Sequence, residues 1–361
     1  MSRVLILKFG AIGDVVMTIP AAYELHRRGH HIEWICGEQV FPLLEQYSWI
    51  RPIAVDDRAL FGGSAIKRLR ALMGLWRAVG GRNYELCATL YYDRRYSFLS
   101  LPVRARRKVM LSHRDRTRRL LPGRHHTDEY LRVMLGSDEG PVTVGLAPVR
   151  PDALPPSALP RMDGRARVVL VPGGARNAMR SDALRRWPIE SYVAVARELA
   201  SRGLEVVLAG GPDDCWASEA FRGLAVTDVI GEMTLLETVA LLDESDVVVT
   251  HDTGPLHLAG LTRVSIVGIF GPTDPRGRMP QRAGTVALWG GEGFACRPCY
   301  DGREYARCSD NACVRQVTPE MVIAEIERLL EQRRNGTEEP PRVMTPVSTV
   351  TAGLRTDVAG V

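Results

Sequence analysis

The sequence predicts an α/β protein with two parallel-sheet domains. Short β-branched runs alternate with longer amphipathic stretches, a pattern typical of parallel strands joined by covering helices. The alternation occurs twice, once on each side of residues 148–160, where five prolines indicate an exposed linker. A chain of 361 residues is also long for a single domain. We therefore expect an N-terminal domain at residues 1–160 and a C-terminal domain at residues 161–334.

In the first domain, each predicted strand is short, apolar and followed by a turn or a helix. A helix over about residues 14–28 follows the first strand and its glycine-rich turn. Ligands of open parallel sheets bind at the carboxyl ends of strands, which makes Arg94 and Arg95, just past the third strand, candidate binding residues. The predicted strands are residues 4–7, 32–36 and 85–90.

In the second domain, every predicted strand ends at or beside Gly, Pro or Asp, so these strand ends are also candidate site positions. A helix begins at Thr318, which can cap it, with proline at the next position. From residue 335 to 361 the periodicity is lost, and we expect a disordered tail. The predicted strands are residues 168–171, 205–209, 246–250 and 264–270.

The composition indicates a folded, cytoplasmic protein. The chain is 45% hydrophobic and 25% charged, with a formal net charge of +5. It contains no apolar run long enough to span a membrane, and its first residues do not resemble a secretory signal. Three of the 47 basic residues are lysines, so 44 are arginines, an excess that we attribute mainly to genome composition. The basic stretch at residues 104–124 is either a solvated face or a site for an anionic acceptor. Its sparse aromatic residues argue against nucleic-acid binding.

Residues 8–14 (KFGAIGD) form a glycine-containing turn between a buried strand and a helix. This turn allows close backbone approach, and a helix start attracts anions. The spacing matches neither the dinucleotide-binding nor the Walker pattern. Asp14 is either the N-cap of the helix or a general base at a ligand site, and the two roles are compatible.

The second domain contains two further candidate anion sites. Residues 172–177 (PGGARN) together with 185–188 (RRWP) resemble a diphosphate cradle, although a solvated basic loop explains them at least as well. Residues 250–259 (THDTGPLHLA) are more specific, because a capping residue, a glycine and a proline begin a helix whose free N–H groups favour a phosphate. His257 lies in its first turn. The turn at residues 270–275 (FGPTDP) lines the same crevice or is simply rigid.

Four cysteines lie within 18 residues near the end of the second domain. Four thiols in one loop can hold zinc or iron tetrahedrally, but this spacing is irregular, and reduced thiols or a conditional disulfide explain it as well. The candidate ligands are Cys296, Cys299, Cys308 and Cys313.

Taken together, these strings resemble glycosyltransferase family 9, the ADP-heptose:lipopolysaccharide heptosyltransferases. The resemblance covers about residues 3–333 in the family's order. It includes the strand, Gly-Asp and proline-containing helix of residues 6–20, the RRWP segment, the DTGPLH block and the FGPTDP turn. The segment at residues 126–131 (HTDEYL) is similar to a family helix start.

The resemblance implies a GT-B fold, two Rossmann-like domains facing each other across a cleft. It implies an inverting glycosyltransferase, most simply one that moves heptose from ADP-heptose to the lipopolysaccharide inner core or another saccharide or glycolipid. On this reading Asp14 is the general base, beside Gly13, Arg94 and Arg95 in the acceptor-binding domain. The donor-binding residues are Gly173, Gly174, Arg185, Asp252, Thr253, Gly254 and His257.

Catalysis is expected to need no cofactor. Because some family members hold iron at a similar cysteine cluster, the resemblance also implies a structural zinc or iron at the four cysteines. We also expect peripheral contact with the inner membrane surface. Arg185 replaces a lysine of better-known members, and the loop at residues 172–184 lacks the threonine of others, which leaves the donor open. Alternative functions are a sugar-nucleotide epimerase or hydrolase of the same fold, a non-catalytic binder, or heptosylation of a protein or small-molecule acceptor.

Overall fold

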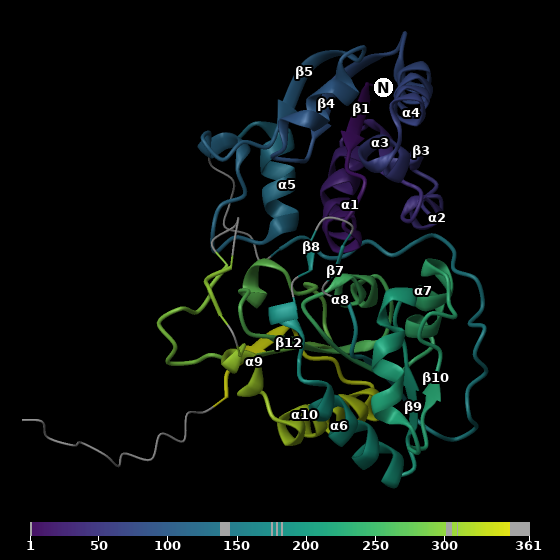
Figure 1. Ribbon diagram of the computed structural model, residues 1–361, viewed down its shortest axis with the longest axis vertical. Coiled ribbons are helices and arrows are strands. Elements are labelled where there is room, and N and C mark those ends of the chain that lie inside the picture. The colour runs from purple at the N-terminus through teal and green to yellow at the C-terminus, as the bar shows by residue number, and fades with distance from the viewer. Residues whose placement is uncertain are drawn as a thin grey trace, which may run out of the picture.

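The computed structural model describes residues 2–137, 145–174, 176–177, 180–181, 183–300, 305–308 and 310–346. Two parallel sheets, one in each half of the chain, are covered by helices on their faces (Figure 1). The predicted α/β fold class with two Rossmann-like domains is confirmed.

The N-terminal domain is built on a five-stranded sheet with the order β3-β2-β1-β4-β5. All neighbouring strands are parallel, so each connection crosses over through helical segments. Its strands are β1 (Arg3–Leu7), β2 (His31–Gly37), β3 (Ile50–Val55), β4 (Asn83–Thr89) and β5 (Arg104–Met110). Its helices are α1 (Ile12–Arg27), α2 (Phe41–Leu44), α3 (Asp57–Gly62), α4 (Ala65–Val79) and α5 (His126–Leu135), with short 3-10 segments η1 (Arg94–Ser100) and η2 (Arg116–Arg118).

The C-terminal domain has a seven-stranded parallel sheet with the order β10-β9-β6-β11-β12-β13-β14. Its strands are β6 (Arg167–Val171), β9 (Glu205–Leu208), β10 (Thr227–Asp228), β11 (Val247–His251), β12 (Ser265–Phe270), β13 (Thr285–Trp289) and β14 (Arg342–Met344), and β7 (Arg176–Asn177) pairs separately with β8 (Arg180–Ser181). Its helical segments are η3 (Ala183–Arg185), α6 (Ile189–Ser201), η4 (Pro212–Phe221), α7 (Leu235–Asp243), α8 (Gly254–Gly260), η5 (Pro275–Gly277), α9 (Ala312–Arg315) and α10 (Pro319–Asn335).

Apolar strands explain why the centre of the C-terminal sheet is buried on both faces. All five residues of β6 and of β11 are buried, which is typical of central strands in parallel sheets. One cluster of buried side chains includes Val15 and Ile19 of α1 together with Leu256 and Leu258 of α8. The two domains therefore share apolar packing where these helices meet.

The structure differs from the sequence-based prediction at several edge strands. The expected disordered tail is wrong for residues 342–344, because β14 pairs with β13 at the edge of the sheet. Residues 347–361 lie outside the described part. The sequence analysis also missed β3, which contains Pro52, and β5, whose arginines hide the strand pattern. Among the described residues, no helix is long and apolar enough to cross a membrane.

Candidate active site

The candidate site lies where the centres of the two sheets approach each other. In each sheet, successive strands are first added on one side of a central strand and then on its other side. This switch falls between β1 and β4 in the N-terminal sheet and between β6 and β11 in the C-terminal sheet. Such switch points form a crevice at the carboxyl ends of the strands. A Cβ on Gly13 at the start of α1 would lie 2.5 Å from Cδ2 of His257 in α8, so the two crevices open toward the same interface.

In the N-terminal domain, Asp14 is held by a buried lysine. Lys8 Nζ donates to Asp14 Oδ2 at 3.0 Å and to the Leu90 carbonyl at 3.1 Å. The Lys8 side chain is 4% exposed, whereas that of Asp14 is 36% exposed. The buried Lys8 ammonium thus orients the Asp14 carboxylate, which stays accessible to a ligand.

The Lys8–Asp14 pair is ionised on both sides. Burial acts to lower the pKa of Lys8, but the Asp14 carboxylate outweighs it and raises that pKa above the ordinary value. Partial burial acts to raise the pKa of Asp14, but the Lys8 ammonium outweighs it and lowers that pKa. Asp14 is therefore an anion at neutral pH. The alternative N-cap role is wrong, because α1 begins at Ile12 and Ala11 occupies the cap.

Tyr91 fixes the backbone of the turn that precedes α1. Its hydroxyl accepts from the Phe9 and Gly10 amides at 2.8 and 3.1 Å and donates to the Gly10 carbonyl at 2.7 Å. The Lys8 ammonium lies 4.5 Å from the centroid of the Tyr91 ring. Tyr91 thus supports both the turn and the lysine that orients Asp14, a role that the sequence analysis did not find.

In the C-terminal domain, Asp252 is the centre of a buried polar cluster. Its residue is 1% exposed, and its Oδ2 accepts from the Thr273 hydroxyl at 2.7 Å. Arg185 Nη1 donates to the Asp252 carbonyl at 2.8 Å and lies 3.5 Å from its Oδ2. Among the residues that the structure describes, Asp252 Oδ1 has no hydrogen-bond partner, so this buried oxygen is available to a ligand hydroxyl.

The charge of Asp252 is maintained by its neighbours. Burial acts to raise the pKa of Asp252, but Arg278 and Arg185 outweigh it and lower that pKa. Burial lowers the pKa of His257 to about 4, so this imidazole is neutral at pH 7. His257 can therefore offer a hydrogen bond to an anion, but not a full positive charge.

Glycines allow the close contacts at this interface. A Cβ on Gly254 would lie 3.4 Å from Cβ of Ile12, at the start of the opposing helix α1. Gly174 has a φ of +86°, and a Cβ there would lie 3.2 Å from Thr253. The N–H groups of Thr253 and Gly254 have no acceptor within the described ranges. The turn before α8 thus presents unused donors between the two domains.

Arg278 is a site residue that the sequence analysis missed. It follows η5, is partly buried, and lies 5.3 Å from the centroid of the Tyr300 ring. Burial acts to lower its pKa, but Asp252 and Asp14 are among the groups that raise it, so the guanidinium lies between carboxylates of both domains. It forms no ion pair with any other residue that the structure describes. Its only signal in the sequence is its position just after FGPTDP.

His126 at the start of α5 also faces this interface. Its Nδ1 is buried and has no hydrogen-bond partner in the described part of the chain, and Gly277 of η5 lies close to its ring. Burial lowers the pKa of His126 to about 3, and Arg278 adds to this effect. The imidazole is therefore neutral and has one unused ring nitrogen.

The predicted glycine cradle contacts an acidic residue of the same domain. Asp214 Oδ1 accepts from the Gly174 amide at 2.7 Å, and its Oδ2 accepts from the Gly211 amide at 3.0 Å. A Cβ on Gly173 would lie 2.2 Å from the Asp214 carboxyl carbon. Gly173 therefore makes room for an acid that already occupies the Gly174 donor. Residues 175, 178–179 and 182, and the side chains of 176–177 and 180–181, lie outside the described part.

Two predicted groups are not brought to the interface. Arg95 is exposed and ion-paired with Asp93 at 2.6 Å, and Arg94 is also exposed, so neither contacts the Asp14 turn in the described part of the chain. Burial raises the pKa of Cys313 to about 11, and the other three clustered thiols add to this, so the four lie in one neighbourhood. Among described residues, however, no group of three or more ligand side chains is placed to hold a metal ion.

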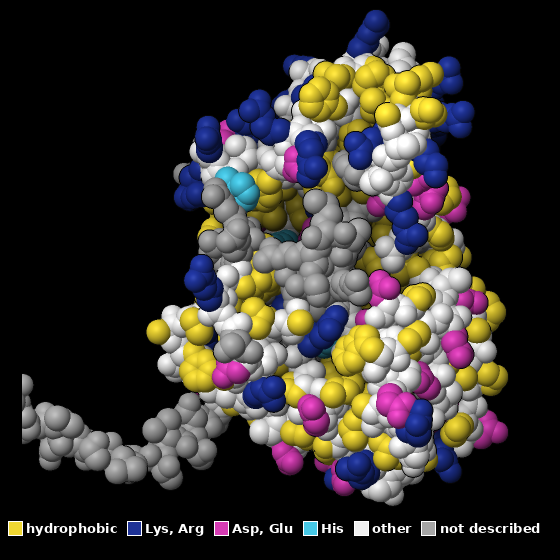
Figure 2. All heavy atoms as spheres, viewed as in Figure 1, with side chains coloured by type: hydrophobic (Ala, Val, Ile, Leu, Met, Phe, Trp, Pro, Cys, Tyr) yellow, Lys and Arg dark blue, Asp and Glu magenta, His cyan; other side chains and the backbone are white. Residues whose placement is uncertain are grey.

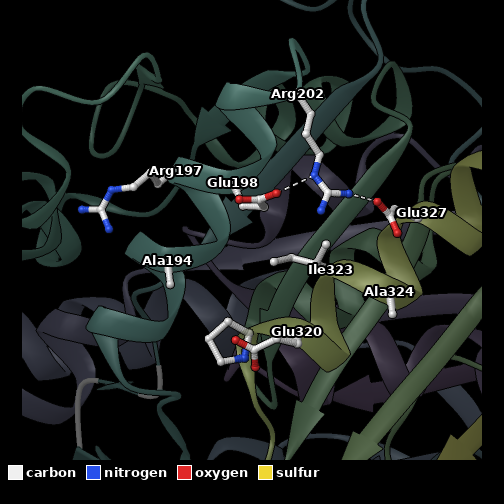
Figure 3. Close-up of a pocket in the computed structure, with 9 residues that line it drawn as sticks. Ala194, Arg197, Glu198, Arg202, Glu320, Ile323, Ala324 and Glu327 are labelled. Atoms are coloured by element: carbon white, nitrogen blue, oxygen red, sulfur yellow. Dashed lines mark hydrogen bonds and ion pairs between the residues drawn. The ribbon is translucent and has the colours of Figure 1, made fainter.

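A separate groove lies between α6 and α10 (Figure 3). Arg202 is paired there with Glu198 at 2.7 Å and with Glu327. The lining residues come from helices on one face of the sheet, and none is at a strand end. This groove is therefore not the candidate active site.

The comparisons with known proteins agree with this geometry. The family model described as glycosyltransferase family 9 (heptosyltransferase) matches residues 158–306, which include the Arg185–Asp252 cluster and Arg278. The matched segment is therefore similar to glycosyltransferase family 9. Within this family, lipopolysaccharide heptosyltransferase 3 of Escherichia coli is 30% identical over 158 residues, or 42% of this chain and 45% of that protein. The chain thus aligns with less than half the length of this curated relative.

Solved structures of family 9 members share the whole fold. ADP-heptose LPS heptosyltransferase II of E. coli has a TM-score of 0.69 at 19% identity, covering 92% of this chain and 99% of that one. The iron-containing dodecameric glycosyltransferase TibC of enterotoxigenic E. coli has a TM-score of 0.57 at 18% identity, covering 93% and 77%. At these identities the likeness establishes the fold, and the activity has to be argued from the site.

Proposed function

We propose that the protein is an inverting glycosyltransferase that transfers heptose from ADP-heptose to the lipopolysaccharide inner core. The observation that supports this most directly is the position of an ionised, accessible Asp14 opposite the Asp252 cluster of the other domain. The names of the relatives supply the substrate class, since they are lipopolysaccharide heptosyltransferases and one solved structure is of an ADP-heptose enzyme.

In the proposed reaction, Asp14 accepts the proton of an acceptor hydroxyl as its oxygen attacks the anomeric carbon of the donor. The bond from that carbon to the diphosphate oxygen breaks, the anomeric configuration inverts, and ADP leaves with the bonding electron pair. Because the pKa of Asp14 is low, proton transfer becomes favourable only as the hydroxyl oxygen bonds to carbon. The N-terminal domain thus binds the acceptor and the C-terminal domain binds the donor.

The charge of the departing diphosphate is balanced by donors of the second domain. Arg185 and Arg278 supply guanidinium groups, and the Thr253 and Gly254 amides supply further N–H donors. Since α8 has only seven residues, we assign the larger part of this stabilisation to the arginines rather than to the helix end. Asp252 orients Arg185 and offers Oδ1 to a sugar hydroxyl.

Arg94 and Arg95 remain predicted binding residues for an anionic acceptor. In this proposal they contact a part of the acceptor that lies away from the reacting atoms. We place the reaction in the cytoplasm at the inner membrane surface, where a glycolipid acceptor is exposed. An epimerase or hydrolase with this fold would turn over the donor when no acceptor is present. A protein or small-molecule acceptor would be recognised by its competition with the glycolipid for heptose transfer.

With two arginines at the leaving group, catalysis by this site does not depend on a metal in our proposal. A structural zinc or iron at the four cysteines stays a separate prediction, encouraged by the iron-containing TibC. It requires the loop to bring the thiols closer together than described, and metal analysis of untreated protein by mass spectrometry checks it.

The donor assignment predicts selective stabilisation by one nucleotide. In a thermal-shift panel of ADP, UDP, GDP and TDP, we expect ADP to raise the melting temperature most, because only a ligand of the folded state stabilises it. For Asp252→Asn we expect that about tenfold more ADP is needed for the same rise in melting temperature, because the substitution removes the charge that orients Arg185. Glu198→Gln, in the α6–α10 groove, is the matched control and should leave the response unchanged. Stabilisation by UDP alone contradicts the ADP assignment, and sensitivity to Glu198→Gln points to the groove instead.

The Lys8–Asp14 pair predicts a shifted pH profile. Without the Lys8 ammonium, partial burial raises the pKa of Asp14, so the base becomes protonated at higher pH than in the wild type. We expect the acidic limb of the kcat/KM profile to move to higher pH in Lys8→Met. Lys108→Met is the control, because within the described ranges Lys108 Nζ donates to the Ser100 carbonyl at 3.0 Å and to no carboxylate. An unmoved acidic limb in Lys8→Met shows that this lysine does not set the ionisation of the base.

A further inference from the structure

Helix α4 carries an apolar stripe that is largely exposed. Ile66, Leu69 and Met73 are 65%, 56% and 39% exposed. Their spacing of three and four residues places them on one side of the helix. Of the 15 residues of α4, only Leu75 and Val79 are buried, so the helix is attached to the domain by its second half.

The same helix is strongly cationic. It contains four basic residues and no acidic residue, and all four are exposed without an ion pair to any other described residue. Arg70 lies four residues after Ile66, and Arg77 lies four residues after Met73, so both border the apolar stripe. The four cations are Lys67, Arg68, Arg70 and Arg77.

The neighbouring segment η1 extends this surface. η1 contacts α4, and Phe98 and the following Leu101 are 62% and 60% exposed. Figure 2 shows hydrophobic side chains gathered at the α4 end of the N-terminal domain, with Lys and Arg side chains at their margin. We call this the α4 face: Ile66, Leu69, Met73, Phe98 and Leu101 with the four cations of α4.

We propose that the α4 face binds the surface of a bilayer rich in anionic lipids. Exposed apolar side chains bordered by arginines suit the boundary between headgroups and acyl chains, because the apolar groups insert while the cations meet lipid phosphates. A second copy of this chain fits less well, since it would bring four unpaired cations against four others. The charge of the face therefore selects an anionic partner.

The place of the α4 face suits a membrane-embedded acceptor. α3 follows the carboxyl end of β3 and leads into α4, so this helical connection starts at the edge of the sheet where the Asp14 turn lies. A Cβ on Gly37 would lie 3.1 Å from Asp57 of α3 and 3.0 Å from the Phe9 carbonyl, which places the start of α3 against that turn. That membrane binding helps the protein to reach its acceptor rests on the proposed function, but the lipid binding itself does not.

Co-flotation of the full chain with vesicles tests the proposal. We expect at least about tenfold stronger binding to phosphatidylethanolamine vesicles containing phosphatidylglycerol than to phosphatidylcholine vesicles, falling as salt is raised. Each cation near an anionic surface contributes roughly fivefold in binding. The double variant Ile66→Glu/Leu69→Glu is expected to lose about tenfold or more, because two carboxylates replace the inserting groups.

Met162→Glu is the matched control, since Met162 is 47% exposed but lies just after the proline-rich linker, outside the α4 face. Both variants should keep the wild-type melting temperature and ADP response, which separates a failure of this proposal from a failure of the proposed function. Equal binding to both vesicle types, or undiminished binding of the double variant, overturns it. If the double variant instead changes the oligomeric state measured by light scattering, the α4 face is a self-association surface and the membrane proposal is wrong.

Discussion

Replacing Asp14 with asparagine is expected to lower kcat by about 10²–10⁴-fold, the usual contribution of a positioned general base. The amide is nearly the same size as the carboxylate but cannot accept the proton of the acceptor hydroxyl. The donor site lies in the other domain, so the stabilisation by ADP should persist in this variant. Steady-state kinetics with donor and acceptor, together with the thermal shift by ADP, measure both parts of the expectation.

Asp14→Asn also leaves the buried Lys8 ammonium without its carboxylate, so a lower melting temperature is expected. Glu24→Gln, on the same helix α1 and paired with Arg28 at 3.0 Å at the surface, is the control for a lost acid and should keep turnover within about twofold. Near-normal turnover by a folded Asp14→Asn protein rejects the base assignment. Loss of the ADP response indicates that the variant perturbs the domain interface rather than the chemistry.

The sequence predicted those parts of the site that a single turn determines. Asp14, Asp252 and His257 each lie just after a strand that enters a helix, and the topology of parallel sheets then brings these turns together. The glycine at position 13 is also required by the structure, because a side chain there would collide with the His257 ring. Such features depend on local backbone geometry and sheet order, both of which leave a pattern in the sequence.

Other parts of the site depend on contacts between distant segments, and the local sequence held no sign of them. The Gly173–Gly174 turn resembles an anion cradle, but Asp214, forty residues later, takes the Gly174 amide. Lys8 looked like an ordinary motif residue, yet it is buried against Asp14 and keeps that carboxylate ionised. In the same way, β14 joins the sheet through a partner far earlier in the chain, and nothing in its own three residues predicts that.

Arg278→Gln is expected to lower kcat by about 10²–10³-fold, the usual cost of removing one group that stabilises developing negative charge. The reason is its position, partly buried between the carboxylates of both domains and without an ion pair among the described residues. A cation in such a place is available to a diphosphate, and the stabilisation by ADP should also weaken. Kinetics at saturating acceptor and ADP titration by thermal shift measure the two effects.

Arg276→Gln is a control two residues away, because Arg276 is 64% exposed and already paired with Asp274 at 2.7 Å. It should change kcat by no more than about twofold, since exposed ion pairs contribute little. Arg278→Lys keeps the charge but loses the planar fork, so an intermediate kcat is expected if Arg278 binds the diphosphate through paired N–H groups. If Arg278→Gln retains kcat while the protein loses stability, Arg278 only neutralises Asp252, and the leaving group must rely on Arg185 and the α8 turn. The ordering wild type, Lys, Gln in kcat therefore separates a contact with the reacting diphosphate from a purely structural charge.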